Sequence, residues 1–122
     1  MIKLAFALAL AAPAAFAAAD KKDAAPVREF KVVNIEYKGA KIWTPGTLVV
    51  RKGDRVKITL VNLAPSGVHA YAIEGYGVNV PVNNKEGDNT KTVEFVADKP
   101  GIFRIYCSMH AAHVGGQLVV LE

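Results

Sequence analysis

Hydrophobic and polar residues alternate over short stretches of the chain, and this two-residue period predicts β-strands rather than helices. The clearest example is residues 55–61, where Val56, Ile58 and Leu60 fall on one face. We expect strands at residues 30–36, 47–50, 55–61, 68–73, 92–96, 102–107 and 117–121. Because no stretch of useful length has a helical period, the sequence predicts an all-β protein.

Turn-forming residues separate these stretches. Examples are Pro45-Gly46, Gly53-Asp54 and the Asp-Lys-Pro-Gly run at residues 98–101. Short strands joined by such turns are typical of an antiparallel sandwich or barrel. Segment 75–87 is interrupted repeatedly by Gly, Asn and Pro, so we expect it to be a long loop that crosses one edge of the sandwich.

The N-terminal segment, residues 1–19, has the layout of a secretory signal peptide. Lys3 gives it a positive start, residues 4–12 are uninterruptedly apolar, and small residues follow. A membrane anchor is the alternative, but the apolar run is too short to span a bilayer. We therefore expect a cleaved signal peptide, a flexible leader at residues 20–26, and a folded domain at residues 27–122 that works in the periplasm.

The composition narrows the function classes. The chain has 122 residues, with 15 Lys and Arg against 11 Asp and Glu, and one cysteine. One cysteine excludes an intramolecular disulfide framework and any cluster built on several thiolates. The sequence has neither a Gly-rich phosphate loop nor basic blocks interleaved with aromatic residues, so we expect no nucleotide or nucleic-acid partner. The mild positive charge fits an acidic protein partner, an anionic surface or a generally solubilising surface.

The candidate chemistry gathers in residues 106–113, which hold the only cysteine and two of the three histidines. In the preceding strand, Cys107 shares a face with Phe103 and Ile105, so the thiol is expected to point inward. A turn must follow before Gly115-Gly116. It can bring the two loop histidines, His110 and His113, back towards the sulfur, and His69 is the only other histidine in the chain.

One thiolate with two or three imidazoles is the ligand set of an electron-transfer copper site. The thiolate favours Cu(I), the imidazoles accept Cu(II), and a rigid β-scaffold limits rearrangement between the two states. Zinc is an alternative, because it binds the same four residues tetrahedrally. The remaining alternative is a buried structural cysteine beside surface histidines.

At these residues the sequence resembles the cupredoxin family. The similarity lies in Gly-Ile-Phe-Arg-Ile-Tyr-Cys at residues 101–107, in residues 116–120, and in residues 47–54 with Asn62 and Pro65 ahead of the first histidine. The resemblance covers the chain from about Val27 to Glu122. It implies a cupredoxin-like Greek-key β-sandwich or barrel that binds one copper ion. The implied metal ligands are His69, Cys107, His110 and His113.

Two subgroups share parts of this pattern, and neither matches it fully. The Cys-x-x-His-x-x-His spacing is similar to the short loop of amicyanins, in which the last ligand is methionine. The overall pattern is nearer to nitrosocyanins, the red copper proteins. These proteins, however, have a glutamate where this chain has His69, and their ligand loop is longer than the one in this chain. Many blue copper proteins have asparagine where this chain has Ala70, and that asparagine braces the thiolate loop. We expect the bracing here to come from elsewhere or to be weaker.

Four other residues near the candidate ligands have plain structural interpretations. Met109 lies between Cys107 and the first loop histidine, and we expect it to be an apolar rim residue rather than an axial ligand. Trp43 and Tyr106 are expected to serve packing and the sheet surface rather than redox chemistry. Glu74 is expected to be a solvated loop end.

Small apolar residues surround the loop histidines and would let a partner approach closely. Our leading hypothesis is a periplasmic one-electron carrier whose partner is a redox protein such as a cytochrome or an oxidoreductase, with no stable membrane insertion. One alternative is a copper redox enzyme, or a site of the nitrosocyanin type that binds nitric oxide or oxygen species. The other is a copper carrier or chaperone, although such proteins usually have Met-rich or multi-thiol sites.

Overall fold

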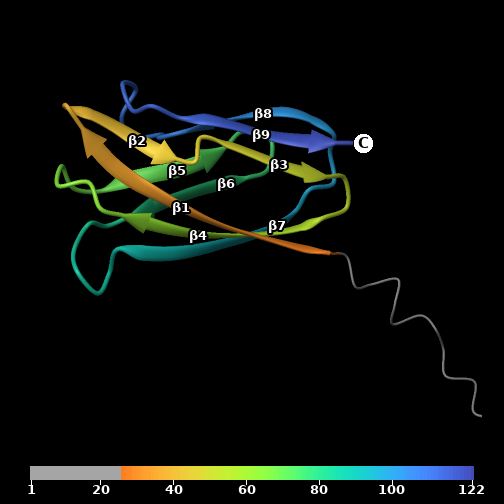
Figure 1. Cartoon of the computed structure of the whole chain (residues 1–122), viewed down its shortest axis with the longest axis horizontal. Helices are drawn as coiled ribbons and strands as arrows, with labels where there is room; N and C mark the ends of the chain where they lie inside the picture. Colours follow the sequence, from red (N-terminus) through yellow and green to blue (C-terminus); the bar gives the residue numbers. More distant parts are fainter. Residues whose placement is uncertain (1–25) are drawn as a thin grey trace, which may run out of the picture.

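The computed structural model describes residues 26–122, which form nine strands and no helix. The predicted signal peptide and all of the predicted leader except Pro26 lie outside the described residues. Two sheets face each other (Figure 1). The first has the order β2-β1-β4-β7, with bounds Ala40–Thr44, Val27–Tyr37, Arg55–Asn62 and Thr90–Val96. The second has the order β3-β9-β8-β5-β6, with bounds Thr47–Arg51, Gly116–Leu121, Gly101–Tyr106, His69–Ile73 and Val78–Val82.

All seven predicted strands are present, and the all-β sandwich prediction is confirmed. The prediction of a long loop at residues 75–87 is wrong, because β6 (Val78–Val82) lies within it. This strand forms one edge of its sheet, and an edge position tolerates Pro81, which lacks a backbone N–H to donate. Strand β2 (Ala40–Thr44) was not expected either; it forms an antiparallel hairpin with β1.

The predicted sandwich was described as antiparallel, but two of its strand pairs are parallel. β1 runs parallel to β4, and β3 runs parallel to β9. Between β1 and β4 the chain passes through β3 in the second sheet, and between β3 and β9 it passes through β4 and β7 in the first sheet. Each parallel pair is therefore joined by a crossover rather than by a hairpin. As a result, β1 and β4 end at the same end of the sandwich, where their arrowheads lie at the left of Figure 1.

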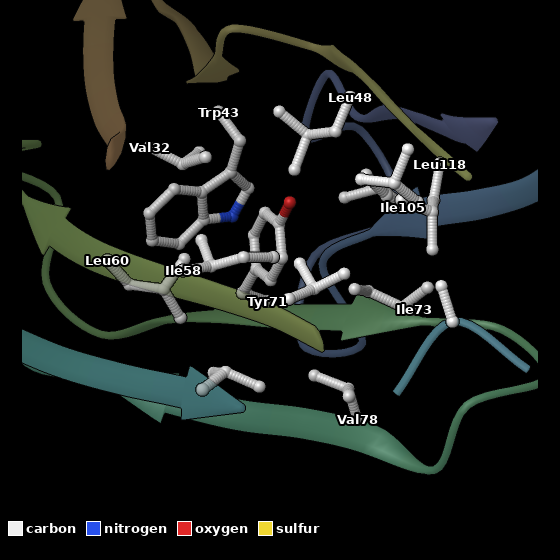
Figure 2. Packing of buried hydrophobic residues seen from close by; sticks show 14 of the residues in the cluster. Val32, Trp43, Leu48, Ile58, Leu60, Tyr71, Ile73, Val78, Ile105 and Leu118 are labelled. Atoms are coloured by element: carbon white, nitrogen blue, oxygen red, sulfur yellow. The ribbon is translucent and has the colours of Figure 1, made fainter. Parts of the chain in front are cut away.

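The core fills the space between the sheets. The predicted inward face of β4 is confirmed, because Val56, Ile58 and Leu60 are all buried. Figure 2 shows the rings of Trp43 and Tyr71 together near the middle of this core, with their centroids 5.3 Å apart in an edge-to-face arrangement. Burial of this apolar surface is the main stabilising contribution to the fold. Residues 26–122 contain no helix that is long and apolar enough to cross a membrane.

Two glycines fix the point where β9 begins. A Cβ on Gly116 would collide with the carbonyl oxygen of Gly46, in the connection between β2 and β3. A Cβ on Gly115 would collide with the carbonyl oxygen of Ile105 in β8. The same Gly46 oxygen accepts a hydrogen bond from the backbone N–H of Gln117 at 2.9 Å. The Gly-Gly pair therefore lets three backbone segments meet at the base of the loop that follows β8.

This contact yields a stability prediction. Gly116→Ala should lower the free energy of unfolding by about 1–3 kcal/mol, as expected for an overpacked site. The matched control is Gly46→Ala across the same contact, where the nearest atom to the added Cβ is an ordinary 3.5 Å away. Urea unfolding of the two variants measures the difference. Equal losses in both variants would contradict the account of this crossing.

Candidate metal centre

The fold brings three of the four predicted ligands together. His69 begins β5, and Cys107 directly follows β8, its antiparallel neighbour in the sheet. The antiparallel pairing places the start of one strand beside the end of the other. Ligand atoms of His69, Cys107 and His110 all lie within 4.8 Å of one another. The Cys107 sulfur and His110 Nδ1 are 3.5 Å apart, so the turn after β8 curls back as expected.

His69 is buried and presents one free ring nitrogen. Its Nε2 is hydrogen-bonded to the hydroxyl of Ser66 at 2.8 Å. Its Nδ1 is also buried and has no hydrogen-bond partner among residues 26–122. A buried nitrogen without a partner is costly unless something binds it. Nδ1 is therefore the atom that His69 can offer to a metal ion.

The thiol of Cys107 is buried and braced by the backbone. The N–H of Ala70 donates a hydrogen bond to the sulfur at 3.3 Å. Such a bond supports negative charge on the sulfur and fixes its position. The sulfur is therefore held by the backbone N–H of Ala70. This contact does not require the asparagine side chain that many blue copper proteins have at this position. His110, in contrast, is exposed to solvent.

His113 lies beside this group with both ring nitrogens in hydrogen-bonding contact. Its ring centroid is 5.0 Å from that of His69. Its Nε2 is 2.8 Å from the side-chain oxygen of Asn34, and its Nδ1 is 3.0 Å from the carbonyl oxygen of Val114. The structure thus places His113 next to the other three residues but outside their converging set, and its role as a ligand stays a prediction.

The β1–β2 hairpin holds the end of the ligand loop, which we define as residues 107–115 between β8 and β9. The N–H of Val114 donates to the carbonyl oxygen of Lys41 at 2.8 Å, and the N–H of Trp43 donates to the carbonyl oxygen of Val114 at 3.3 Å. The indole N–H of Trp43 donates to the carbonyl oxygen of Ala70 at 3.0 Å. Trp43 is buried, as its packing interpretation predicted, and it connects β2 to the strand that begins with His69.

The remaining flanking residues also have clear positions. Met109 is more than half exposed, which fits a rim residue. Glu74 is exposed and follows the end of β5 opposite His69, so it lies away from the centre.

Two residues that contact the histidines, Ser66 and Asn34, were not predicted from the sequence. Asn34 carries a detectable signal, because it continues the inward face of Val32 with a polar side chain where an apolar one would be expected.

The surroundings keep the buried imidazoles neutral. Burial in the first place, and the neighbouring His113 and His110 rings next, lower the pKa of His69 to about 4. Burial also lowers the pKa of His113. A neutral imidazole has a lone pair for a metal ion, whereas a protonated one has none. At neutral pH the buried rings of His69 and His113 therefore keep a lone pair that a metal ion can bind.

Comparisons with known proteins identify the family and the fold. Residues 1–120 match the family described as the cupredoxin-like domain. Nitrous-oxide reductase from Ralstonia nicotianae is 36% identical over 100 residues, which cover 78% of this chain and 15% of that protein. This chain therefore spans only a small part of the curated relative that it matches.

Two solved structures share the fold. Copper nitrite reductase from Nitrosomonas europaea matches with a TM-score of 0.61 at 21% identity, over 78% of this chain and 41% of that one. Dithionite-reduced auracyanin from the photosynthetic bacterium Roseiflexus castenholzii matches with a TM-score of 0.59 at 14% identity, over 77% of this chain and 97% of that one. The narrower similarity to nitrosocyanins stays a prediction.

The lowered pKa of His69 predicts the pH dependence of the metal-free protein. Its value is lower in the folded state than the unperturbed 6.5, so His69 stabilises the fold above about pH 6.5 and this stability is lost as the pH falls towards 4. In NMR titrations, the His69 ring signals should stay in their neutral position down to about pH 4.5. Urea unfolding should show a weaker loss of stability between pH 6.5 and 4.5 in His69→Gln than in the wild type. A midpoint near 6.5 for His69 would contradict this account.

Proposed function

The chain belongs to the cupredoxin-like domain family, and on that premise we propose that it is a periplasmic copper protein that carries one electron at a time. The proposed ligands are the thiolate of Cys107 and the imidazoles of His69 and His110, with His113 as a fourth. The observation that carries this proposal is the convergence of a braced, buried sulfur with imidazole nitrogens at one end of a rigid sandwich.

The donor set fits copper in both of its oxidation states. A thiolate is a soft ligand that favours Cu(I), whereas imidazole nitrogens also suit Cu(II). The hydrogen bonds that position Cys107 and His69 come from backbone or from a neighbouring side chain, so the site is fixed before metal arrives. A site that does not rearrange on oxidation supports rapid electron transfer. The nitrite reductase that shares this fold is a copper protein, which supports the same choice of metal.

Zinc is the less favoured metal. Structural zinc sites have four ligands in an even tetrahedron, whereas here three donors converge and His113, which lies outside that set, would be a weaker fourth. With His113 as a harder donor than a thioether, we expect a lower reduction potential and a less blue colour than in amicyanins.

The surroundings of His110 fit a short electron-transfer route to a partner. His110 is the exposed residue among the three that converge. Large apolar side chains are exposed at the same end of the sandwich, namely Leu63 after β4, and Met109 and Val114 in the ligand loop. Redox partners form small, short-lived interfaces, and an apolar surface next to an exposed imidazole allows close approach without a stable complex. The proposed partner is another redox protein.

Electron self-exchange tests this role. Two copies that meet through this end bring their His110 rings together, so Leu63→Glu places like charges in the encounter. We expect self-exchange, measured by NMR line broadening in mixtures of Cu(I) and Cu(II) protein, to slow by about tenfold or more. The visible spectrum should be unchanged, because Leu63 is not a ligand.

The matched control is Ile102→Glu. Ile102 is 70% exposed, comparable to the 60% of Leu63, but it lies in the first half of β8, away from the ligand loop. Its variant should exchange electrons at nearly the wild-type rate. Equal slowing in both variants, or none in Leu63→Glu, would contradict transfer through this end of the molecule.

A further inference from the structure

Two fully buried asparagines lie directly behind His113. Asn34 in β1 and Asn62 in β4 are register partners in the parallel pair, and both side chains have no exposed surface. Their side chains are joined by a hydrogen bond from Asn34 Nδ2 to Asn62 Oδ1 at 3.0 Å. Buried amides among apolar strands are costly unless every polar atom is used, so their arrangement calls for an explanation.

The surrounding carbonyl groups fix which way the Asn62 amide faces. Its nitrogen donates to the carbonyl oxygens of Gly67 at 2.8 Å and Val82 at 2.9 Å, and neither oxygen can donate in return. Its oxygen accepts from the backbone N–H of Ala64 at 3.0 Å. A flipped amide would place oxygen against two carbonyl oxygens and nitrogen against an N–H, so only one orientation is possible.

The orientation of Asn62 in turn fixes that of Asn34. The oxygen of Asn62 needs a donor, so the nitrogen of Asn34 faces it and the oxygen of Asn34 faces His113. That oxygen and the carbonyl oxygen of Val114 on the other side of the ring can only accept, and a neutral imidazole has one hydrogen to donate. The Val114 oxygen already accepts the N–H of Trp43, whereas the buried oxygen of Asn34 has no other donor among residues 26–122, so the hydrogen is assigned to Nε2. In the neutral ring the lone pair is then on Nδ1. The carbonyl oxygen of Val114, 3.0 Å from Nδ1, has no hydrogen to donate to this lone pair.

We propose that Asn34, oriented by Asn62, is a positioning residue that makes Nδ1 of His113 the metal-binding atom and so brings this histidine into the copper site as its fourth ligand. This inference rests on the proposed function. A metal-binding histidine usually donates its other ring N–H to a fixed acceptor, which sets its tautomer. Asn34 meets that description from β1, 79 residues away from His113 in the sequence.

Ser66, the hydrogen-bond partner of His69, does not fix a tautomer in the way that Asn34 does. The hydroxyl of Ser66 can rotate to donate or to accept, so its contact with His69 Nε2 is compatible with either tautomer. An asparagine oxygen held by a second asparagine has no such freedom. The structure therefore specifies the tautomer of His113 more strictly than that of His69.

The first test uses the metal-free wild-type protein and needs no variant. Long-range nitrogen–proton NMR correlations identify the tautomer of each histidine, and we expect His113 to be protonated on Nε2 alone at pH 7.5. Protonation on Nδ1, or on both nitrogens, would overturn the proposal. This readout does not depend on copper, so it remains decisive if the protein proves not to bind copper.

The second test compares copper binding in Asn34→Leu with the wild type. Loss of such a partner typically weakens metal binding by about 10–100-fold, and we expect a loss in that range. The reduction potential should rise, because a donor that stabilises Cu(II) is held less well. The control is Asn84→Ala, which removes another asparagine at this end that bonds only the carbonyl oxygen of Ala64. The Asn84→Ala variant should have the copper affinity and the reduction potential of the wild type.

A double-mutant cycle separates positioning from general damage to the fold. In a His113→Phe background, Asn34→Leu should no longer shift the reduction potential, because its effect passes through His113. An equal shift with and without His113, or no shift in the single variant, would overturn the proposal. Failure of the wild type to develop a thiolate–copper band would instead reject the proposed function and leave the tautomer result to decide the role of Asn34.

Discussion

The backbone of Ala70 connects the elements on which the centre depends. Its N–H donates to the sulfur of Cys107, and its carbonyl oxygen accepts the indole N–H of Trp43. One residue of β5 thereby links the end of β8 to β2 in the facing sheet. The histidine immediately before it, His69, is positioned by the same strand. If β5 moved relative to β8, the sulfur, the first histidine and the tryptophan would all lose their relative positions.

A second constraint is the burial of polar groups at this end of the sandwich. Four polar side chains are buried here, namely Asn34, Asn62, His69 and His113. Burying polar groups is less favourable in free energy than burying apolar side chains of the same size. Nearly every polar atom of the two asparagines is used in a hydrogen bond. Nδ1 of His69 has no hydrogen-bond partner among the described residues. Stability is thus given up where the proposed copper ion would recover it, a pattern expected of functional sites.

The parts of this protein that could be predicted from sequence are those determined locally. The strand at β4 followed from its alternating residues, and the grouping of Cys107 with His110 followed from a short loop after a strand. β6 was missed because Asn79 and Pro81 obscure the alternation of its three valines, and because an edge strand can tolerate them. The parallel pairing of β1 with β4 could not be read, since it depends on a crossover between sheets. For the same reason nothing in the sequence placed Asn34 beside His113.

The most direct test of the central claim is a Cu(II) titration of the metal-free protein followed by visible absorption. The account predicts an intense thiolate-to-copper band that saturates at one equivalent and is absent in Cys107→Ser, whose hydroxyl cannot replace the braced sulfur. A colourless protein, a band that persists without Cys107, or oxidation of the thiol without a stable band would contradict a redox copper centre at this site.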